Sequence, residues 1–130
     1  MQVNTEDFWG ELGTATVRTP VSLMREQAAL LGKKTSNLVE AHVKTDSEGG
    51  RLVHRFHLIV PALDGYTYRL FKVSHGMEIY PVMVGGYDPR NPLDSKQLAN
   101  EQEFTDFLRE ILSAESTKRI ILTLLAQVQQ

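Results

Sequence analysis

Two runs of alternating apolar and polar residues, 38–45 and 51–60, constrain the fold more than any other feature of the chain. They flank the stretch Asp46-Ser-Glu-Gly-Gly50, a composition typical of the loop of a β-hairpin. With residues 47–50 as the loop, Asp46 lies opposite Arg51 and most apolar residues of both strands fall on one face. A slip of one residue would mix the two faces, so we predict an antiparallel hairpin in this register.

Two further strands are predicted, over residues 66–74 and 77–84, because both stretches are rich in aromatic and β-branched residues. Asp64-Gly65 is a strong signal for the turn that precedes the third strand. His75-Gly76 stands between the third and fourth strands at the spacing of a two-residue turn. Histidine tolerates a positive φ better than most residues, and glycine adopts it freely, so we interpret His75 as a turn residue.

Three helices complete the predicted fold. Thr19 and Pro20 are typical of a helix start, and Gly32 of a helix end. Asn100 and Ser116 are the predicted N-caps of two C-terminal helices with one-sided apolar stripes. We therefore predict a single α+β domain over residues 1–130: an N-terminal helix, a four-stranded antiparallel β-meander, and two C-terminal helices packed on one face of the sheet. Residues 1–18 are expected to be a weakly structured N-terminal segment. The predicted covered face consists of Val39, Ala41, Val43, Phe56, Leu58, Phe71 and Val73.

Composition excludes several classes of function. The chain has 130 residues, no cysteine and a formal net charge of -2. A disulfide framework, a thiolate metal site and a cysteine nucleophile are therefore impossible. The acidic balance argues against binding of nucleic acid. No apolar run is long enough to span a bilayer and the N-terminus lacks signal-peptide character, so we expect no membrane association and a cytoplasmic location.

One group of side chains on the uncovered face could carry chemistry. In the predicted register Glu40 lies opposite His57, and His42 is the diagonal neighbour of His57. Two histidines and a carboxylate can bind a divalent metal or transfer a proton. The simpler interpretation is a pair of polar residues on a half-exposed sheet surface. His54 points to the other face, where we expect a histidine at the rim of the core with a hydrogen-bond partner.

Three classes of function remain, and no cofactor or metal is predicted. We rank a non-catalytic protein-interaction domain first, of the adaptor, inhibitor, immunity or effector-chaperone type. A small enzyme or metal-binding protein using Glu40, His42 and His57 comes second. A domain that binds a small ligand in a pocket beside the loop of residues 85–99 comes third.

The predicted partner-binding surface is an apolar row on the outer face of the sheet, with a polar rim typical of interfaces. Self-pairing of this face would give a homodimer. The alternative is that Phe8 and Trp9 of the N-terminal segment fold over the row and bury it. The row consists of Leu38, Val53, Ile59, Tyr68 and Leu70.

Overall fold

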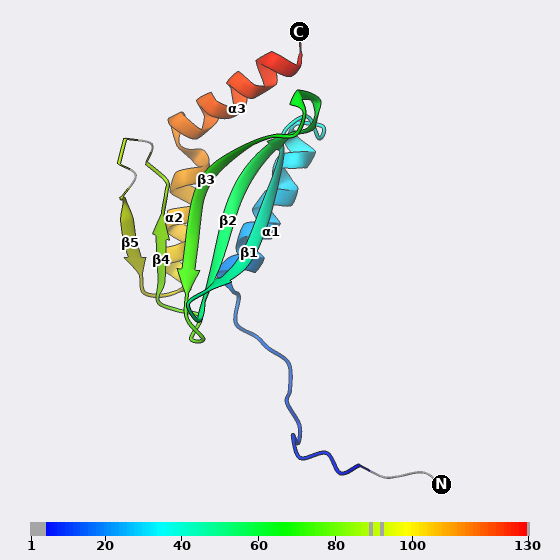
Figure 1. Cartoon of the computed structure of the whole chain (residues 1–130), viewed down its shortest axis with the longest axis vertical. Helices are drawn as coiled ribbons and strands as arrows, with labels where there is room; N and C mark the ends of the chain where they lie inside the picture. Colours follow the sequence, from blue (N-terminus) through cyan, green and yellow to red (C-terminus); the bar gives the residue numbers. More distant parts are fainter. Residues whose placement is uncertain (1–4, 89, 92, 130) are drawn as a thin grey trace.

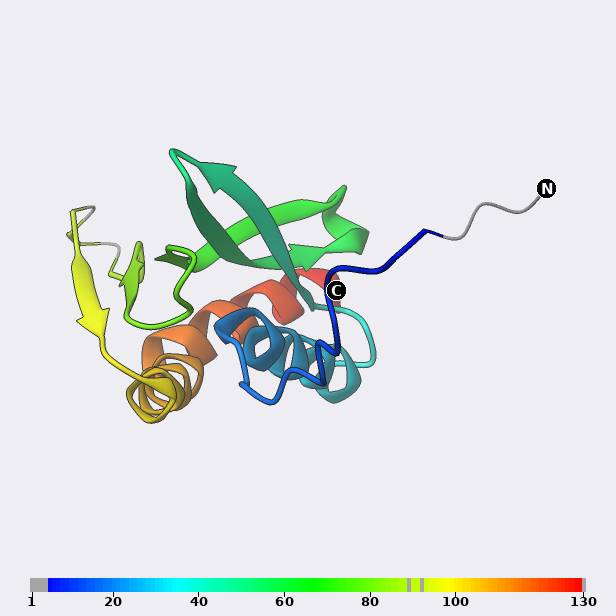
Figure 2. The ribbon, with the colours of Figure 1, turned by 90° about the horizontal axis from the view of Figure 1, so that it is seen from below.

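The computed structural model describes residues 5–88, 90–91 and 93–129. Within them one antiparallel sheet has the strand order β1-β2-β3-β4-β5, and the three helices lie together on one of its faces (Figures 1 and 2). The predicted α+β fold is confirmed, but the sheet has five strands and not four. The elements follow the order α1 (Pro20–Lys34), β1 (Glu40–Glu48), β2 (Arg51–Val60), a 3-10 turn (Pro61–Leu63), β3 (Tyr66–His75), β4 (Val82–Gly85), β5 (Ser95–Leu98), α2 (Glu101–Ser113) and α3 (Glu115–Val128).

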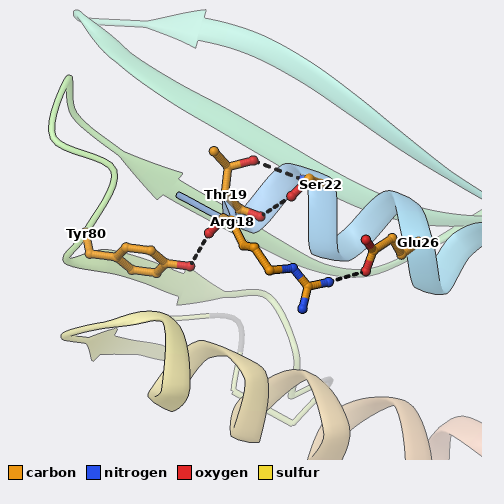
Figure 3. Close-up of polar contacts among 5 residues, drawn as sticks. All are labelled: Arg18, Thr19, Ser22, Glu26 and Tyr80. Atoms are coloured by element: carbon orange, nitrogen blue, oxygen red, sulfur yellow. Dashed lines mark hydrogen bonds and ion pairs between the residues drawn. The ribbon is translucent and has the colours of Figure 1, made fainter. Parts of the chain in front are cut away.

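Helix α1 begins where the sequence predicted and continues beyond the predicted end at Gly32. The Oγ1 of Thr19 accepts a hydrogen bond from the N–H of Ser22 at 3.2 Å, which caps the helix (Figure 3). Gly32 is not the terminating residue but a buried residue of the last turn. A Cβ there would lie 3.0 Å from Oδ1 of Asn37, so the glycine allows that side chain to approach the helix.

The hairpin of β1 and β2 turns more tightly than the sequence predicted. Gly49 and Gly50 form a two-residue loop with φ of 57° and 79°, and Glu48 lies opposite Arg51. Paired glycines at positive φ match the twist of the flanking strands, which is why the shorter loop is favoured. The register therefore differs by two residues from the predicted one, and a shift of two leaves every side chain on its predicted face.

A β-bulge in β3 changes the faces of that strand. Phe71 lies opposite Phe56, whereas Arg69 lies opposite His57, so Leu70 is an extra residue in the ladder. Leu70 and Phe71 are both buried in the core, at 6% and 0% exposure. For the residues of β3 that precede the bulge, the two faces of the strand are exchanged relative to the prediction. Tyr68 then faces the core, and Arg69 faces the open side of the sheet.

The connection from β3 to β4 is not the two-residue turn that we predicted. His75 is the last residue of β3, it is buried, and it has no positive φ. Residues 76–81 then lead to β4, where Val73 lies opposite Val84. The predicted loop of residues 85–99 contains β5, which pairs with β4. The carboxylate of Asp94 closes the loop between them by accepting hydrogen bonds from three backbone N–H groups, those of Gly86, Tyr87 and Asp88.

The two C-terminal helices follow the prediction except at one cap. Oδ1 of Asn100 accepts a hydrogen bond from the N–H of Glu103 at 2.9 Å, as expected of an N-cap. Helix α3 begins before Ser116, with Ala114 at the N-cap position and no side-chain cap. Oγ1 of the buried Thr117 donates to the carbonyl of Ile111 at 2.7 Å, which ties the start of α3 to the end of α2.

The core lies between the sheet and the helices, on the predicted face. Five of the seven residues predicted for that face are buried, and the remaining two, Ala41 and Val43, are half-buried against the core. Phe71 stacks on Phe56 with 5.2 Å between ring centroids and meets Phe107 of α2 edge-on at 5.6 Å. Aromatic contacts of this kind add to the free energy of burial, so they fix α2 against the centre of the sheet.

Gly85→Ala should destabilise the fold while Gly76→Ala should not. A Cβ at Gly85 would lie 2.9 Å from the carbonyl oxygen of Asp94, which is backbone and cannot turn aside. A Cβ at Gly76 would meet only Nη1 of Arg51, at 3.8 Å. We expect urea denaturation to show a loss of about 1–3 kcal/mol for Gly85→Ala and little change for the control. Equal stability of the two variants would contradict the packing described at Gly85.

Candidate functional site

The apolar row predicted for partner binding does not lie together on the outer face. Tyr68 and Leu70 face the core because of the bulge, and Leu70 is buried in it. Leu38 precedes β1 and is half-buried, and Ile59 lies opposite Glu40, not Leu38. Val53 does lie on the outer face, yet it is only 6% exposed. The outer face therefore lacks the contiguous apolar centre that the prediction required.

The uncovered side of β1, β2 and β3, which we call the open face, carries two polar rows instead. In the first, Arg55 lies between Lys44 and Lys72 and donates to Asp46 at 2.7 Å and Glu48 at 2.9 Å. In the second, His57 lies directly between His42 and Arg69. Burial, followed by the charges of Arg69 and Arg55, lowers the pKa of His57. The open face thus carries the basic side chains of Lys44, Arg55, Arg69 and Lys72 together with three carboxylates, those of Glu40, Asp46 and Glu48.

The second row corrects the predicted arrangement of Glu40, His42 and His57. Glu40 lies opposite Ile59, not opposite His57, and its Oε1 lies 3.1 Å from Nε2 of His42 on the same strand. In the described ranges, no three histidine, aspartate or glutamate side chains come close enough together to hold a metal ion. Among the same residues, no helix combines the length and apolar character needed to cross a bilayer.

The N-terminal segment, residues 5–17, does not cover the sheet. Phe8 is 87% and Trp9 80% exposed, and the chain runs away from the domain beyond the start of α1 (Figure 1). Its exit is anchored: the side chain of Arg18 binds Glu26, and the hydroxyl of Tyr80 donates to the carbonyl of Arg18 at 3.3 Å (Figure 3). Its described part forms neither helix nor strand, and residues 1–4 of the predicted N-terminal segment lie outside the described residues.

An apolar groove opens on the helical side of the molecule, between α1 on one side and α2 and α3 on the other. We call it the interhelical groove; its volume is about 580 Å³. Its floor is the core side of the sheet, with Phe56, Leu58 and Leu70. Leucine and isoleucine side chains of the three helices form the walls: Leu30, Leu31, Leu108, Leu112 and Ile121.

The charged residues that line the interhelical groove all have the same sign. Lys34, Arg109 and Lys118 border it, and none of the described residues that line it is an aspartate or a glutamate. Arg109 also contacts Asp106, an exposed neighbour on α2, at 3.2 Å. A concave apolar surface with a few charged groups at its edge suits the apolar side chains of a partner that carries negative charge nearby.

A second cavity, of about 560 Å³, lies beside residues 86–88, close to the position predicted for a ligand pocket. It reaches from the helix side, at Ile111 and Thr117, to three basic side chains of the sheet. Those three are Arg55, His57 and Arg69. This cavity is therefore more polar than the interhelical groove, and Asp88 lines it together with the two arginines.

A chain of buried histidines, which sequence reasoning missed, joins three strands. Nε2 of His54 lies 2.9 Å from Nε2 of His75, and Nδ1 of His54 lies 2.8 Å from Oγ1 of Thr45. Nδ1 of His75 lies 2.8 Å from the carbonyl oxygen of Gly76. The expected role of His54, a core-rim histidine with a hydrogen-bond partner, is confirmed, and the interpretation of His75 as a turn residue is wrong.

The partners fix the positions of the protons in this chain of histidines. A carbonyl can only accept, so Nδ1 of His75 carries a proton; in a neutral ring, Nε2 of His75 then accepts a hydrogen bond from the N–H at Nε2 of His54. Nδ1 of His54 then accepts from the hydroxyl of Thr45. Every polar atom is satisfied while both rings are neutral, which accounts for their burial at 2% and 6% exposure.

Searches of protein families, of curated proteins and of solved structures found no match to this chain. Its function is therefore inferred from the chemistry of its surfaces.

Acid should destabilise the protein through His54. Burial, then the nearby His75 and Arg25, lower its pKa from 6.5 to about 4. Between these values the unfolded chain binds a proton that the folded chain does not, so stability falls as pH falls through this window and levels off below it. Above pH 6.5 both states are neutral at this residue and stability is independent of its titration.

We expect a loss of roughly 2–3 kcal/mol between pH 6.5 and pH 4, measured by urea denaturation. His54→Gln, which keeps a donor and an acceptor without titrating, should make the profile less steep in this range and leave the contribution of His57, whose pKa is also lowered. The exposed His42→Gln is the control and should leave the slope unchanged. A wild-type slope that persists in His54→Gln would contradict the assignment.

Proposed function

We propose that this chain is a non-catalytic protein-binding domain that holds apolar side chains of a protein partner in the interhelical groove. The observation that carries the proposal is the groove itself, where core residues of the sheet are reachable between the helices. This replaces the outer sheet face with the helical side as the binding surface. The lack of cysteine suits a reducing compartment, and the proposal includes a cytoplasmic location.

The groove has the properties that favour binding of an apolar anchor. Leucine, isoleucine and phenylalanine form most of its lining, with Gln27, Thr105, Ser113 and Thr117 between them, so filling it removes apolar surface from water on both partners. An anchor that reached its floor would contact side chains of the core, as anchors do at the centres of protein interfaces. The exposed ammonium groups of Lys34 and Lys118 at its edge would favour partners with acidic residues beside the anchor.

The dye 1-anilinonaphthalene-8-sulfonate, an apolar ring system with one negative charge, should bind the folded protein in this groove. Leu112→Glu places a carboxylate in the apolar wall, and we expect at least a tenfold weaker dye affinity because the charge must be desolvated. Leu122→Glu is the matched control: Leu122 is on α3, 64% exposed and not part of the groove. Dye fluorescence is the measurement, and circular dichroism checks folding.

Equal dye binding by Leu112→Glu and Leu122→Glu would sink the proposal, since the dye would then bind elsewhere. If Leu112→Glu does not fold, Leu31→Glu on the opposite wall is used in its place. That residue lines the groove from α1.

A second candidate, binding of a small anionic ligand, is favoured by the cavity beside residues 86–88. Its basic residues Arg55, His57 and Arg69 come from adjacent strands, and the field of the two arginines opposes a charge on His57. An anion bound between them would offset that field. It would also gain charge-assisted hydrogen bonds from the guanidinium groups.

Sulfate should therefore raise the pKa of His57 measured by NMR, relative to sodium chloride at the same ionic strength. Arg69→Gln should remove most of this rise, because it takes away one side of the site. His42, exposed on the neighbouring strand, is the internal control. A pKa of His57 that responds equally to both salts would exclude a specific anion site.

A further inference from the structure

The N-terminal segment and the interhelical groove have complementary properties. Residues 5–17 contain three acidic residues, Glu6, Asp7 and Glu11, and no lysine or arginine. The apolar side chains between them are exposed: Phe8 at 87%, Trp9 at 80% and Leu12 at 79%. The groove, in contrast, is apolar with only basic charged residues at its border.

We propose that the N-terminal segment of one copy of this chain binds in the interhelical groove of a second copy, with Phe8 and Trp9 as its anchors. This inference rests on the proposed function of the groove and names its partner. Reciprocal exchange of two segments gives a closed twofold dimer, the commonest form of homo-oligomer.

The direction of the exit favours a second copy, because residues 5–17 run away from the domain and not back along α1 toward their own groove (Figure 1). The groove lies against the last turns of α1, at Leu30, Leu31 and Lys34, whereas the segment leaves from the first turn (Figure 1). The contacts of Arg18 with Glu26 and Tyr80 hold that exit in place (Figure 3). From Arg18 the nine residues to Trp9 reach about 30 Å at most when extended, enough to cross to a neighbouring molecule.

The segment also has suitable local order and size. The N–H of Trp9 donates to Oδ1 of Asp7 at 2.8 Å, which holds an acidic group beside the aromatic pair. Phenylalanine and tryptophan bury about 150–250 Å² each. Two exchanged segments would bury on the order of 800 Å² of their own surface and a similar area of the grooves, within the range of specific interfaces.

Trp9 is the only tryptophan of the chain, so its fluorescence reports docking directly. In the full chain we expect its emission to move to shorter wavelength as protein concentration rises, together with dimer formation in light scattering. A shift that is already complete at the lowest concentration would mean docking within one chain. Absence of any shift would mean no docking. Either result overturns the inference.

A mixing experiment separates exchange from other modes of dimerisation. Phe8→Ser/Trp9→Ser gives a chain without tryptophan whose groove is intact. Leu112→Glu gives a chain with Trp9 whose groove is blocked. Each should be monomeric alone, and adding the first to the second should move the emission of Trp9 to shorter wavelength. No change on mixing would contradict docking between copies.

Charge reversal at the border tests the same contact without touching the core. Lys34→Glu/Lys118→Glu changes exposed residues of the groove and should weaken dimer formation about tenfold, equivalent to about 1.4 kcal/mol. Lys33→Glu/Arg119→Glu is the matched control, with the same charge change at neighbouring positions outside the groove. Equal effects of the two pairs would overturn the predicted contact. If Leu112→Glu does not fold, Lys34→Glu/Lys118→Glu replaces it in the mixing experiment as the chain that carries Trp9.

The outcome also distinguishes this inference from the proposed function. Suppose that Trp9 never docks in the full chain, but Phe8→Ser/Trp9→Ser still binds the dye and loses this binding when Leu112→Glu is added. The groove then binds another partner, and only the inference fails. If dye binding does not depend on Leu112, the proposed function fails with it.

Discussion

The extra residue in β3 determines where the chain places its apolar and its charged side chains. Without the bulge, strict alternation would put Leu70 and Lys72 on the same face as Tyr68. With it, Leu70 and Phe71 both enter the core, while Arg69 turns to the open face beside His57. The bulge thus places Leu70 in the floor of the interhelical groove and Arg69 on the open face. A bulge also increases the local twist, so the third strand diverges from a flat ladder at the point where the floor of the groove lies.

Periodicity was sufficient for much of the fold. The helix starts at Thr19 and Asn100, the face that carries Val39 and Phe56, and the α+β class all follow from local patterns with strong physical causes. The hairpin loop shows how an error can be harmless. Choosing four loop residues in place of Gly49-Gly50 moved the register by two, and side chains repeat every two residues along a strand. The prediction that Glu40 lies directly opposite His57 was therefore wrong, although each of the two side chains lies on its predicted face of the sheet.

Missing the bulge is an error of one residue in the pairing of β3. Unlike the two-residue error in the hairpin, it moves side chains to the wrong face of the sheet. No glycine or proline marks Leu70, and both Leu70 and Phe71 are apolar, so the sequence carries no local sign that two neighbours share a face. The histidine chain was hidden for a related reason. His54 and His75 are 21 residues apart, and only the observed register, with His54 opposite Val73 and Leu52 opposite His75, makes them neighbours. A turn signal at Gly76 masked this pairing, because it accounted for His75 without reference to any distant residue.

The groove and the N-terminal segment differ in how closely they are tied to folding. Phe56 and Leu58 form the floor of the groove and also the centre of the core, so substitutions there change stability and binding together. Phe8 and Trp9 make no contribution to the core. The contact of Arg18 with Glu26 fixes the point where the segment joins α1. In the proposed complex, binding specificity would therefore be adjustable at the segment and at the basic border of the groove with little loss of stability. Leaving two aromatic side chains in water is unfavourable for a lone molecule in proportion to the area that it exposes. Burial of these side chains in an apolar groove would recover that free energy, which is the physical reason for proposing that the two surfaces bind each other.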